Sequence, residues 1–212
     1  MNKWFKFIIS KLQYDSLPQL LLNAGKFFKV HVNPYYVYQE FIDASIENEP
    51  GTEYSEITIR DLKEKDLPEI LAFPDRLDSM ERLQNRLNRG DLCIGAWYRD
   101  RLIAFSWANV TSFEFLSSKF ALFEDEAYLY DAFTAKAFRG KRLAYILRSE
   151  LYKVLKKKGI NKLYSVSLKY NASAIRFKNN IKATSIGSGI QVDVFNKWKF
   201  VRLSEFEEKH ML

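Results

Sequence analysis

The chain has 212 residues, of which 47% are hydrophobic and 28% charged. This composition excludes an intrinsically disordered protein and suits one globular domain with an extension. A single cysteine, Cys93, and two histidines exclude an internal disulfide and a Cys/His zinc site, so we expect a cytoplasmic protein without a metal. The formal charge of +7 is divided unevenly, because residues 131–212 carry a surplus of +12 whereas residues 1–130 sum to −5.

Residues 1–13 have the pattern of a short amphipathic, basic helix. One face of this helix carries Trp4, Phe5, Ile8, Ile9 and Leu12, and three lysines lie elsewhere. The apolar run is too short to cross a membrane, and it lacks the features of a secretory signal. Two interpretations remain: the helix packs on its own domain or on a second subunit, or it makes a peripheral contact with a membrane surface.

A linker is predicted before the main folding unit. Asn33-Pro34 predicts a turn, and residues 45–55 combine acidic and polar side chains with Pro50 and Gly51. We therefore divide the chain into an N-terminal amphipathic and helical extension with its linker, residues 1–52, and one domain, residues 53–212.

The first half of this domain alternates between strand and helix patterns. The predicted elements are a strand at 56–62, helices at 66–72 and 78–90, a hairpin of strands at 92–98 and 101–109, and a strand at 127–134. Cys93 falls inside the hairpin and is expected to be a small core residue. The aromatic side chains of this region either line an acceptor pocket or belong to the core: Trp97, Tyr98, Phe105, Trp107, Phe113 and Phe115.

A basic turn and a strongly periodic helix follow. Arg139-Gly140-Lys141-Arg142 precedes a helix whose apolar face ends before Gly159. A strand that runs through a glycine-containing turn into a helix N-terminus is an anion site, because unpaired N–H groups and the positive end of the helix dipole converge there. The turn is neither a P-loop nor a dinucleotide-binding turn.

The basic surplus of residues 131–212 also indicates an anionic partner. Nucleic acid, a membrane headgroup and a phosphorylated small molecule are the alternatives, and a solvated lysine face would explain the charge without any partner. No RNP-like or helix-turn-helix pattern is found, so a nucleic-acid partner is not expected.

Two segments resemble a known family. Arg139-Gly140-Lys141-Arg142-Leu143-Ala144 is similar to the acetyl-coenzyme A turn of the GNAT N-acetyltransferases, Q/R-x-x-G-x-G/A, with Arg142 where the family usually has its middle glycine. The segment from Asn171 to Lys178 is similar to the family's N-x-x-A/S-x-x-L/F-Y helix start, with Lys178 in the tyrosine position.

The resemblance implies an α+β fold of the GNAT type. Its central mixed sheet has six to seven strands, with the fourth and fifth strands splayed apart and helices on both sides. The order of elements over residues 56–203 agrees with this fold, since further strands are predicted at 162–170, 187–194 and 197–203.

The resemblance also implies an acetyl-CoA-dependent N-acetyltransferase, an acyltransferase that transfers an acetyl group to a primary amine by direct attack. The acceptor is a small molecule such as an amino sugar, an amino acid or an envelope precursor, and the enzyme is a monomer or a homodimer. The residues implied to bind the coenzyme are Phe133, Thr134, Arg139, Gly140, Lys141, Arg142, Leu143, Ala144, Asn171, Ala174, Phe177 and Lys178.

The catalytic groups are less sharply indicated. Tyr128 stands where several relatives carry a glutamate base, and Tyr130 and Asp131 are the neighbouring polar candidates. Lys178 either donates a proton to the thiolate or is a solvated lysine. Arg142 and Lys178 favour an alternative in which the same fold is a non-catalytic acyl-CoA-binding regulatory module.

Overall fold

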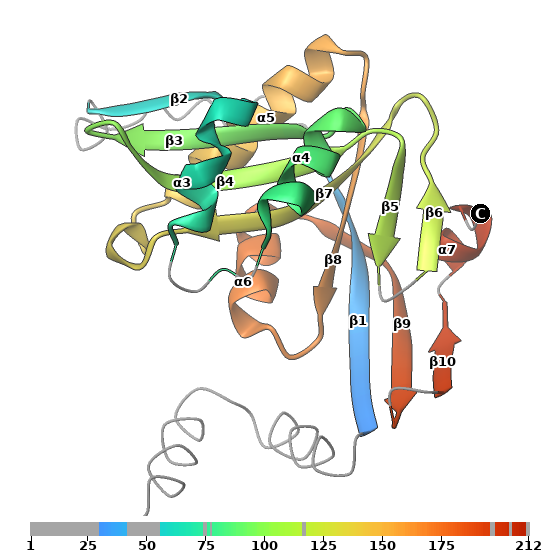
Figure 1. Cartoon of the computed structure of the whole chain (residues 1–212). Coiled ribbons are helices and arrows are strands. Elements are labelled where there is room, and N and C mark those ends of the chain that lie inside the picture. The colour runs from blue at the N-terminus through green and yellow to red at the C-terminus, as the bar shows by residue number, and fades with distance from the viewer. Residues whose placement is uncertain are drawn as a thin grey trace, which may run out of the picture. The chain divides into compact units, whose positions relative to one another are not determined.

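The computed structural model describes residues 30–41, 56–73, 76, 78–115, 118–195, 198–203 and 205–210 (Figure 1). The predicted helix at 1–13 and the linker at 45–55 lie outside these residues. The chain forms two compact units: a larger one, residues 39–165 with 210–212, and a smaller one, residues 1–38 with 166–209. In the described part of the chain, no helix combines the length and apolar character needed to cross a membrane.

A mixed sheet organises the larger unit. Its strands, in spatial order, are β2 (Ile57–Asp61), β3 (Leu92–Tyr98), β4 (Arg101–Asn109), β7 (Glu126–Thr134) and the first part of β8 (Lys162–Leu168). The pairs from β2 to β7 are antiparallel, and β7 pairs with β8 in parallel. The strands predicted at 56–62, 92–98, 101–109, 127–134 and 162–170 are all present. The α+β class with a mixed sheet is therefore confirmed.

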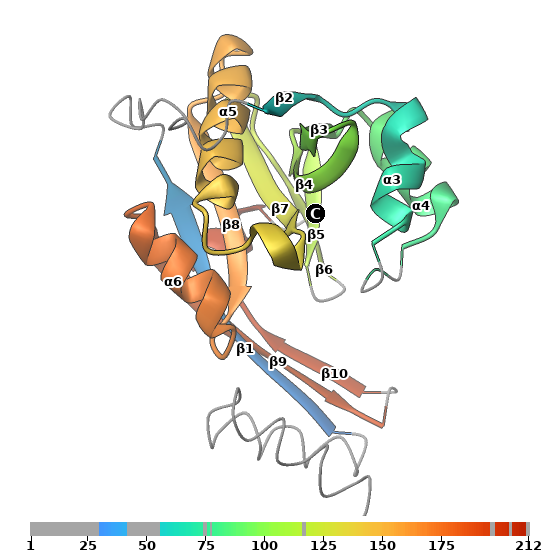
Figure 2. The same ribbon diagram turned by 90° about the vertical axis from the view of Figure 1, so that its left-hand side faces the viewer.

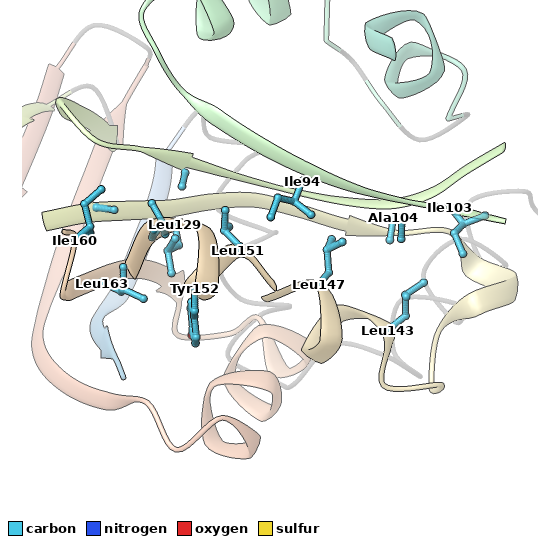
Figure 3. Close-up of a cluster of buried hydrophobic side chains, with 14 residues drawn as sticks. Ile94, Ile103, Ala104, Leu129, Leu143, Leu147, Leu151, Tyr152, Ile160 and Leu163 are labelled. Atoms are coloured by element: carbon cyan, nitrogen blue, oxygen red, sulfur yellow. The ribbon is translucent and has the colours of Figure 1, made fainter. Parts of the chain in front are cut away.

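Helix α5 (Leu143–Lys157) covers one face of this sheet (Figure 2). Leu143, Leu147, Leu151 and Leu155 recur every fourth residue and are all at most 2% exposed. They pack on strand side chains that include Leu129 (Figure 3). Complete burial of a leucine side chain contributes roughly 1.5–3 kcal/mol. This stripe fixes α5 along β7 and thereby fixes the turn that precedes it.

Two short helices cover the opposite face (Figure 2). They are α3 (Leu67–Leu71), which follows the 3-10 turn η4 (Glu64–Asp66), and α4 (Met80–Asn88). Trp97, Phe105 and Trp107 lie in the core beneath them, and none is more than 5% exposed. These rings are therefore core residues, although Trp97 also lines a polar recess beside β2. Cys93 is 3% exposed, as expected for a small core residue.

The connection between β4 and β7 is a two-stranded ribbon. Strands β5 (Ser112–Phe115) and β6 (Ser118–Ala121) pair in antiparallel fashion. Phe113 stacks on Phe120 at 4.6 Å between ring centroids and on Tyr128 at 4.3 Å. Aromatic stacking therefore fastens this ribbon to β7.

The smaller unit contains β1 (Val30–Glu40, to Tyr38), β9 (Thr184–Val194), β10 (Trp198–Arg202), α6 (Ala172–Asn180) and most of α7 (Glu205–His210). β9 and β10 are the strands predicted at 187–194 and 197–203, and they pair in antiparallel fashion.

The predicted turn at Asn33-Pro34 is wrong, because β1 runs through it. Its Val and Tyr side chains favour a strand, and Tyr35 and Val37 are fully buried. Tyr35 lies so close to Gly189 that an added Cβ would be 2.2 Å from its hydroxyl, so only glycine fits at that position.

Candidate functional site

The outer edge of β7 is open over most of its length. Pairing with β8 covers only the first three residues of β7 and ends at Tyr128, which is opposite Tyr164. On its other side β7 pairs with β4 as far as Thr134. Among the described residues, β7 therefore has one partner strand from Leu129 onward, as the expected splay of these two strands requires. An open edge presents backbone groups that an extended ligand can pair with.

A β-bulge interrupts β7 at Asp131. Tyr130 lies opposite Trp107 and Phe133 opposite Phe105, so Asp131 and Ala132 together face a single residue of β4. Asp131 adopts a left-handed backbone with φ of 44°. The bulge therefore breaks the regular ladder at the start of the open edge.

The N–H groups of the residues after the bulge have alternating directions. The Ala135 N–H donates to the Ile103 carbonyl at 2.8 Å, towards β4. Because N–H directions alternate along a regular strand, the N–H of Thr134 points the other way. This backbone donor thus faces the open edge.

The Asp131 carboxylate is held by two arginines. Arg76 approaches both carboxylate oxygens, at 2.6 and 2.8 Å, and Arg86 donates to one of them at 2.5 Å. Asp78 completes the cluster by pairing with both guanidinium groups. Burial opposes ionisation, but the arginines outweigh it and hold the pKa of Asp131 below its ordinary value. Asp131 is therefore an ionised carboxylate with saturated oxygens.

The Tyr130 hydroxyl donates a hydrogen bond to buried Asp91. The same carboxylate accepts from Asn109 at 2.5 Å and pairs with Arg89 at 2.8 Å. Burial raises the pKa of Tyr130 well above its ordinary value, and the hydrogen bond to Asp91 adds to this effect. Tyr130 is therefore a neutral phenol with its proton committed to Asp91.

Tyr128 is 7% exposed and stacks on Tyr130 at 5.9 Å between ring centroids. Two residues before it, buried Glu126 pairs with His210 at 2.9 Å and accepts from the Tyr164 hydroxyl at 3.2 Å. The Phe123 N–H is a third donor to Glu126, at 3.1 Å. This carboxylate, like those of Asp91 and Asp131, is already engaged by several donors.

The basic turn begins directly after β7. The 3-10 turn η5 (Lys136–Phe138) leads to Arg139, whose Nε donates to the Thr134 carbonyl at 3.0 Å. The Arg139 guanidinium also lies 5.8 Å from the Phe133 ring centroid. Gly140 has a φ of 80°, and a Cβ built on it would meet nothing within 4 Å. Glycine is therefore favoured at this position by its left-handed backbone. A side chain would meet no steric obstacle there.

Arg142 is the N-cap of α5 and has a left-handed backbone, with φ of 59° and ψ of 6°. Its side chain makes no capping hydrogen bond and lies 5.3 Å from the Tyr145 ring centroid. The left-handed conformation explains why glycine is usual at this position in the family that the turn resembles. Arginine keeps the same backbone path at a cost of roughly 1–2 kcal/mol.

The helix start provides backbone donors and exposed cations. Within the described residues, the N–H groups of Gly140, Arg142, Leu143 and Ala144 find no backbone acceptor. The side chains of Arg139, Lys141 and Arg142 are exposed around them. The arrangement can hold an anionic group such as a pyrophosphate.

The remaining predicted coenzyme residues, Asn171, Ala174, Phe177 and Lys178, lie in the smaller unit, in α6 and at its N-cap. Asn171 caps this helix, its side-chain oxygen accepting from the Ala174 N–H at 3.0 Å. Lys178 is only 4% exposed, and its Nζ lies 5.6 Å from the Phe177 ring centroid. The interpretation of Lys178 as a solvated lysine is therefore wrong.

The arginine cluster, Asp91 and His210 were not predicted as site residues. Arg76 and Arg86 are 55 and 45 residues from Asp131, and His210 is 84 residues from Glu126. No local spacing marks such pairs. Among the described residues, no group of three His, Cys, Asp or Glu side chains could hold a metal ion.

A polar recess of about 400 Å³ lies elsewhere, at the β2 edge. The Arg60 guanidinium stacks 3.6 Å from the Trp97 ring centroid there, and Arg60 also pairs with Asp66. Glu69 accepts from the Trp97 indole and the Leu102 N–H. Trp97, one of the aromatic side chains considered for an acceptor pocket, lines this recess, whereas none of the predicted catalytic or coenzyme-binding residues does.

Comparisons with known proteins bear on the family and on the fold. A family model described as Acetyltransferase (GNAT) family matches residues 57–178. No curated protein matches the chain.

The chain is similar to several solved structures, of which those with TM-scores of 0.52 and 0.56 share its fold. A putative GNAT acetyltransferase from Novosphingobium aromaticivorans is 20% identical, with 76% of this chain and 63% of that chain covered and a TM-score of 0.52. A Drosophila protein is 13% identical, with 92% and 58% covered and a TM-score of 0.56. An aminoglycoside acetyltransferase from an uncultured soil metagenomic sample is 17% identical, with 60% and 88% covered and a TM-score of 0.47. Since the family model covers more than half of the residues, the chain belongs to the GNAT family of acetyltransferases.

Proposed function

We propose that this protein is an acetyl-CoA-dependent N-acetyltransferase that acts on a primary amine of a small molecule. The observation that carries the proposal is the open edge of β7, which leads directly into the 139–144 turn at the start of α5. An edge for an extended arm, followed by an anion site, has the chemistry to bind coenzyme A.

The coenzyme would bind to this edge and turn in two parts. Its pyrophosphate would accept from the N–H groups at the start of α5, with Lys141 and Arg142 adding positive charge. The pantetheine amides would pair with the backbone at Phe133 and Thr134 in the manner of an added strand. The occupant is a co-substrate and no metal takes part in the proposed reaction.

The acetyl carbonyl would accept a backbone N–H from the open edge beside the bulge. This donor stabilises the negative charge that develops on the oxygen as the amine attacks, an effect worth about 10²–10³-fold in rate for one such donor. The amine nitrogen forms a bond to the carbonyl carbon and loses a proton, the C–S bond breaks, and the thiolate leaves and is protonated. The resemblance to the family assigns the donor of that proton to the tyrosine position, which Lys178 occupies in this sequence.

We assign Tyr130 and Asp131 to positioning, although the sequence nominated them as acid–base groups together with Tyr128, which is 7% exposed and stacks on Tyr130. The Tyr130 proton is committed to Asp91, and the Asp131 carboxylate is saturated by arginines. Glu126, the other carboxylate near Tyr128, accepts from three donors. The amine would therefore attack after losing its proton to solvent, so kcat/KM should rise with pH up to the pKa of the acceptor amine.

Two measurements test this function. Acetyl-CoA, but not DNA or RNA, should raise the melting temperature, because only the former has both the anion and the extended arm. Release of free thiol should then follow when amino sugars, amino acids and envelope-precursor amines are presented. Absence of stabilisation by acetyl-CoA would refute the proposal.

The second candidate is a non-catalytic coenzyme-binding module of the same fold. The engaged carboxylates and the lysine at position 178 favour it. Stabilisation by acetyl-CoA without thiol release for any amine of the panel would support this module over the enzyme.

We further propose that residues 1–13 make a peripheral membrane contact for an otherwise cytoplasmic protein, a monomer or homodimer. The amphipathic pattern of these residues supports the contact. Co-sedimentation with anionic liposomes should fall when residues 1–13 are removed, and equal pelleting of both proteins would refute it.

A further inference from the structure

We infer that Arg76 and Arg86 are positioning residues that hold the β7 bulge in its reactive form by clamping Asp131. The inference rests on the proposed function, because the bulge lies where the acetyl carbonyl would bind. The two arginines come from the segment between α3 and α4 and from α4 itself, so the clamp connects that segment to the reacting edge.

The clamp is largely buried. The side chains of Arg76, Arg86, Asp78 and Asp131 are 14%, 13%, 7% and 15% exposed. Within the clamp two guanidinium groups face two carboxylates, and a third, exposed arginine, Arg82, lies 3.9 Å from Asp78. The clamp itself therefore adds no net charge beside the open edge.

Aromatic rings contact both arginines of the clamp. The Arg76 guanidinium lies 5.2 Å from the Phe105 ring centroid, and the Arg86 guanidinium lies 5.3 Å from that of Trp107 and 5.2 Å from that of Tyr130. Both Phe105 and Trp107 are fully buried in β4, the strand opposite the bulge. The clamp is thus braced against the same strand from which β7 departs at the bulge.

The clamp acts on the backbone of its own residue. Asp131 has the left-handed φ of 44° at the bulge, and the backbone continues from the bulge to Thr134, whose N–H faces the open edge. The bidentate bond from Arg76 and the single bond from Arg86 fix the Asp131 side chain, and hence the direction of this N–H. A shift of about 1 Å in such a donor is enough to cost about 10²-fold in rate.

Three substitutions at residue 131 separate the clamp from backbone preference. All three remove the carboxylate that the arginines bind. Asparagine and glycine both tolerate the left-handed backbone, whereas alanine does not, so Asp131→Ala loses the carboxylate and the backbone preference together. If the clamp holds the bulge, all three variants lose about 10²-fold in kcat while KM for acetyl-CoA changes by less than about 3-fold. Arg86→Lys, which keeps the charge but not the planar fork, should lose less than Arg86→Ala.

Asp100 supplies the matched control. It also has a left-handed backbone, with φ of 61°, but it lies in the exposed turn between β3 and β4. Asp100→Asn, Asp100→Gly and Asp100→Ala make the same demands on a left-handed backbone without touching the clamp. These variants should keep the wild-type kcat.

The outcomes are distinguishable from failure of the proposed function. Wild-type kcat in both Asp131→Asn and Asp131→Gly would overturn the clamp and leave the enzyme intact. A wild type that neither binds acetyl-CoA nor releases thiol would refute the enzyme instead. In that case the backbone amide resonances of residues 130–133 still test the clamp. They should move in Asp131→Asn, Arg76→Lys and Arg86→Lys, and unchanged resonances in these variants would overturn it.

Discussion

The β7 bulge and the 139–144 turn both depend on a non-glycine residue with a left-handed backbone, but they are held in opposite ways. At the bulge, Asp131 is partly buried and bound by two arginine side chains. At the turn, Arg142 is exposed and its side chain makes no capping bond. Charge pairing therefore fixes the first region, whereas the second relies on the packing of α5 and on its own backbone. Mutations, pH and salt should affect the two regions differently.

The largest effect is expected next to the bulge, at Asp91. Asp91→Ala leaves the buried donors of Tyr130 and Asn109 and the Arg89 guanidinium without their shared acceptor. Arg89 is 46% exposed and can be solvated, but a donor left unsatisfied away from water costs about 1–3 kcal/mol, so with two such donors the free energy of unfolding should fall by about 3 kcal/mol in urea denaturation. Asp91→Asn, which keeps an acceptor oxygen, should lose less. Equal stability of Asp91→Ala and wild type would show that the network is not stabilising.

A pH effect is expected at a third charge-paired site, Asp66. The hydrogen bond from Arg60 lowers the pKa of Asp66 to about 2, although burial opposes it. A carboxylate with a lowered pKa stabilises the fold above its unfolded pKa of about 3.9, and this contribution is lost as the pH falls towards 2. Because Arg60 is partly exposed, we expect a loss of about 1–2 kcal/mol. Asp66→Asn should flatten this part of the pH–stability curve, and an unchanged curve would contradict the assignment.

In the 139–144 turn, substitutions that change the preference for a left-handed backbone should change the free energy of unfolding. Arg142→Gly removes a left-handed non-glycine residue and should raise the free energy of unfolding by up to about 1 kcal/mol, whereas Gly140→Ala should lower it by about 1 kcal/mol. Both are measured by urea denaturation. Since a Cβ at Gly140 meets no neighbour, a much larger loss would point to contacts beyond backbone strain.

The smallest effect is expected from salt. Exposed cations surround the turn, so KM for acetyl-CoA should rise a few-fold between about 0.05 M and about 0.5 M salt. Partly buried ion pairs such as those of the clamp are screened much less by salt, so kcat should stay constant. A fall in kcat with an unchanged KM would reverse the comparison of the two regions.

The regular parts of the fold could be predicted because their signals are local. The leucines of α5 follow a helical period, and the turn before this helix has its own sequence pattern. The seven predicted strands are present for the same reason. Strand β1 was missed because Asn33-Pro34 is a strong local turn signal, whereas burial of Tyr35 and Val37 decides the structure.

The candidate site could be predicted only in part. The 139–144 turn is contiguous, so its spacing is visible in the sequence. The clamp joins residues 45 and 55 positions apart, and the bulge at Asp131 arises from a register shift that no pattern in β7 marks. The buried Lys178 has the same origin, because a lysine on a polar-looking helix face is buried only through tertiary packing.

The most direct test of the central claim is a map of backbone amide resonances during titration with acetyl-CoA. Binding along the open edge of β7 and at the start of α5 predicts the largest shifts at residues 132–134 and 140–144. Saturable binding with its largest shifts elsewhere, for instance around the recess at Trp97, would contradict the account.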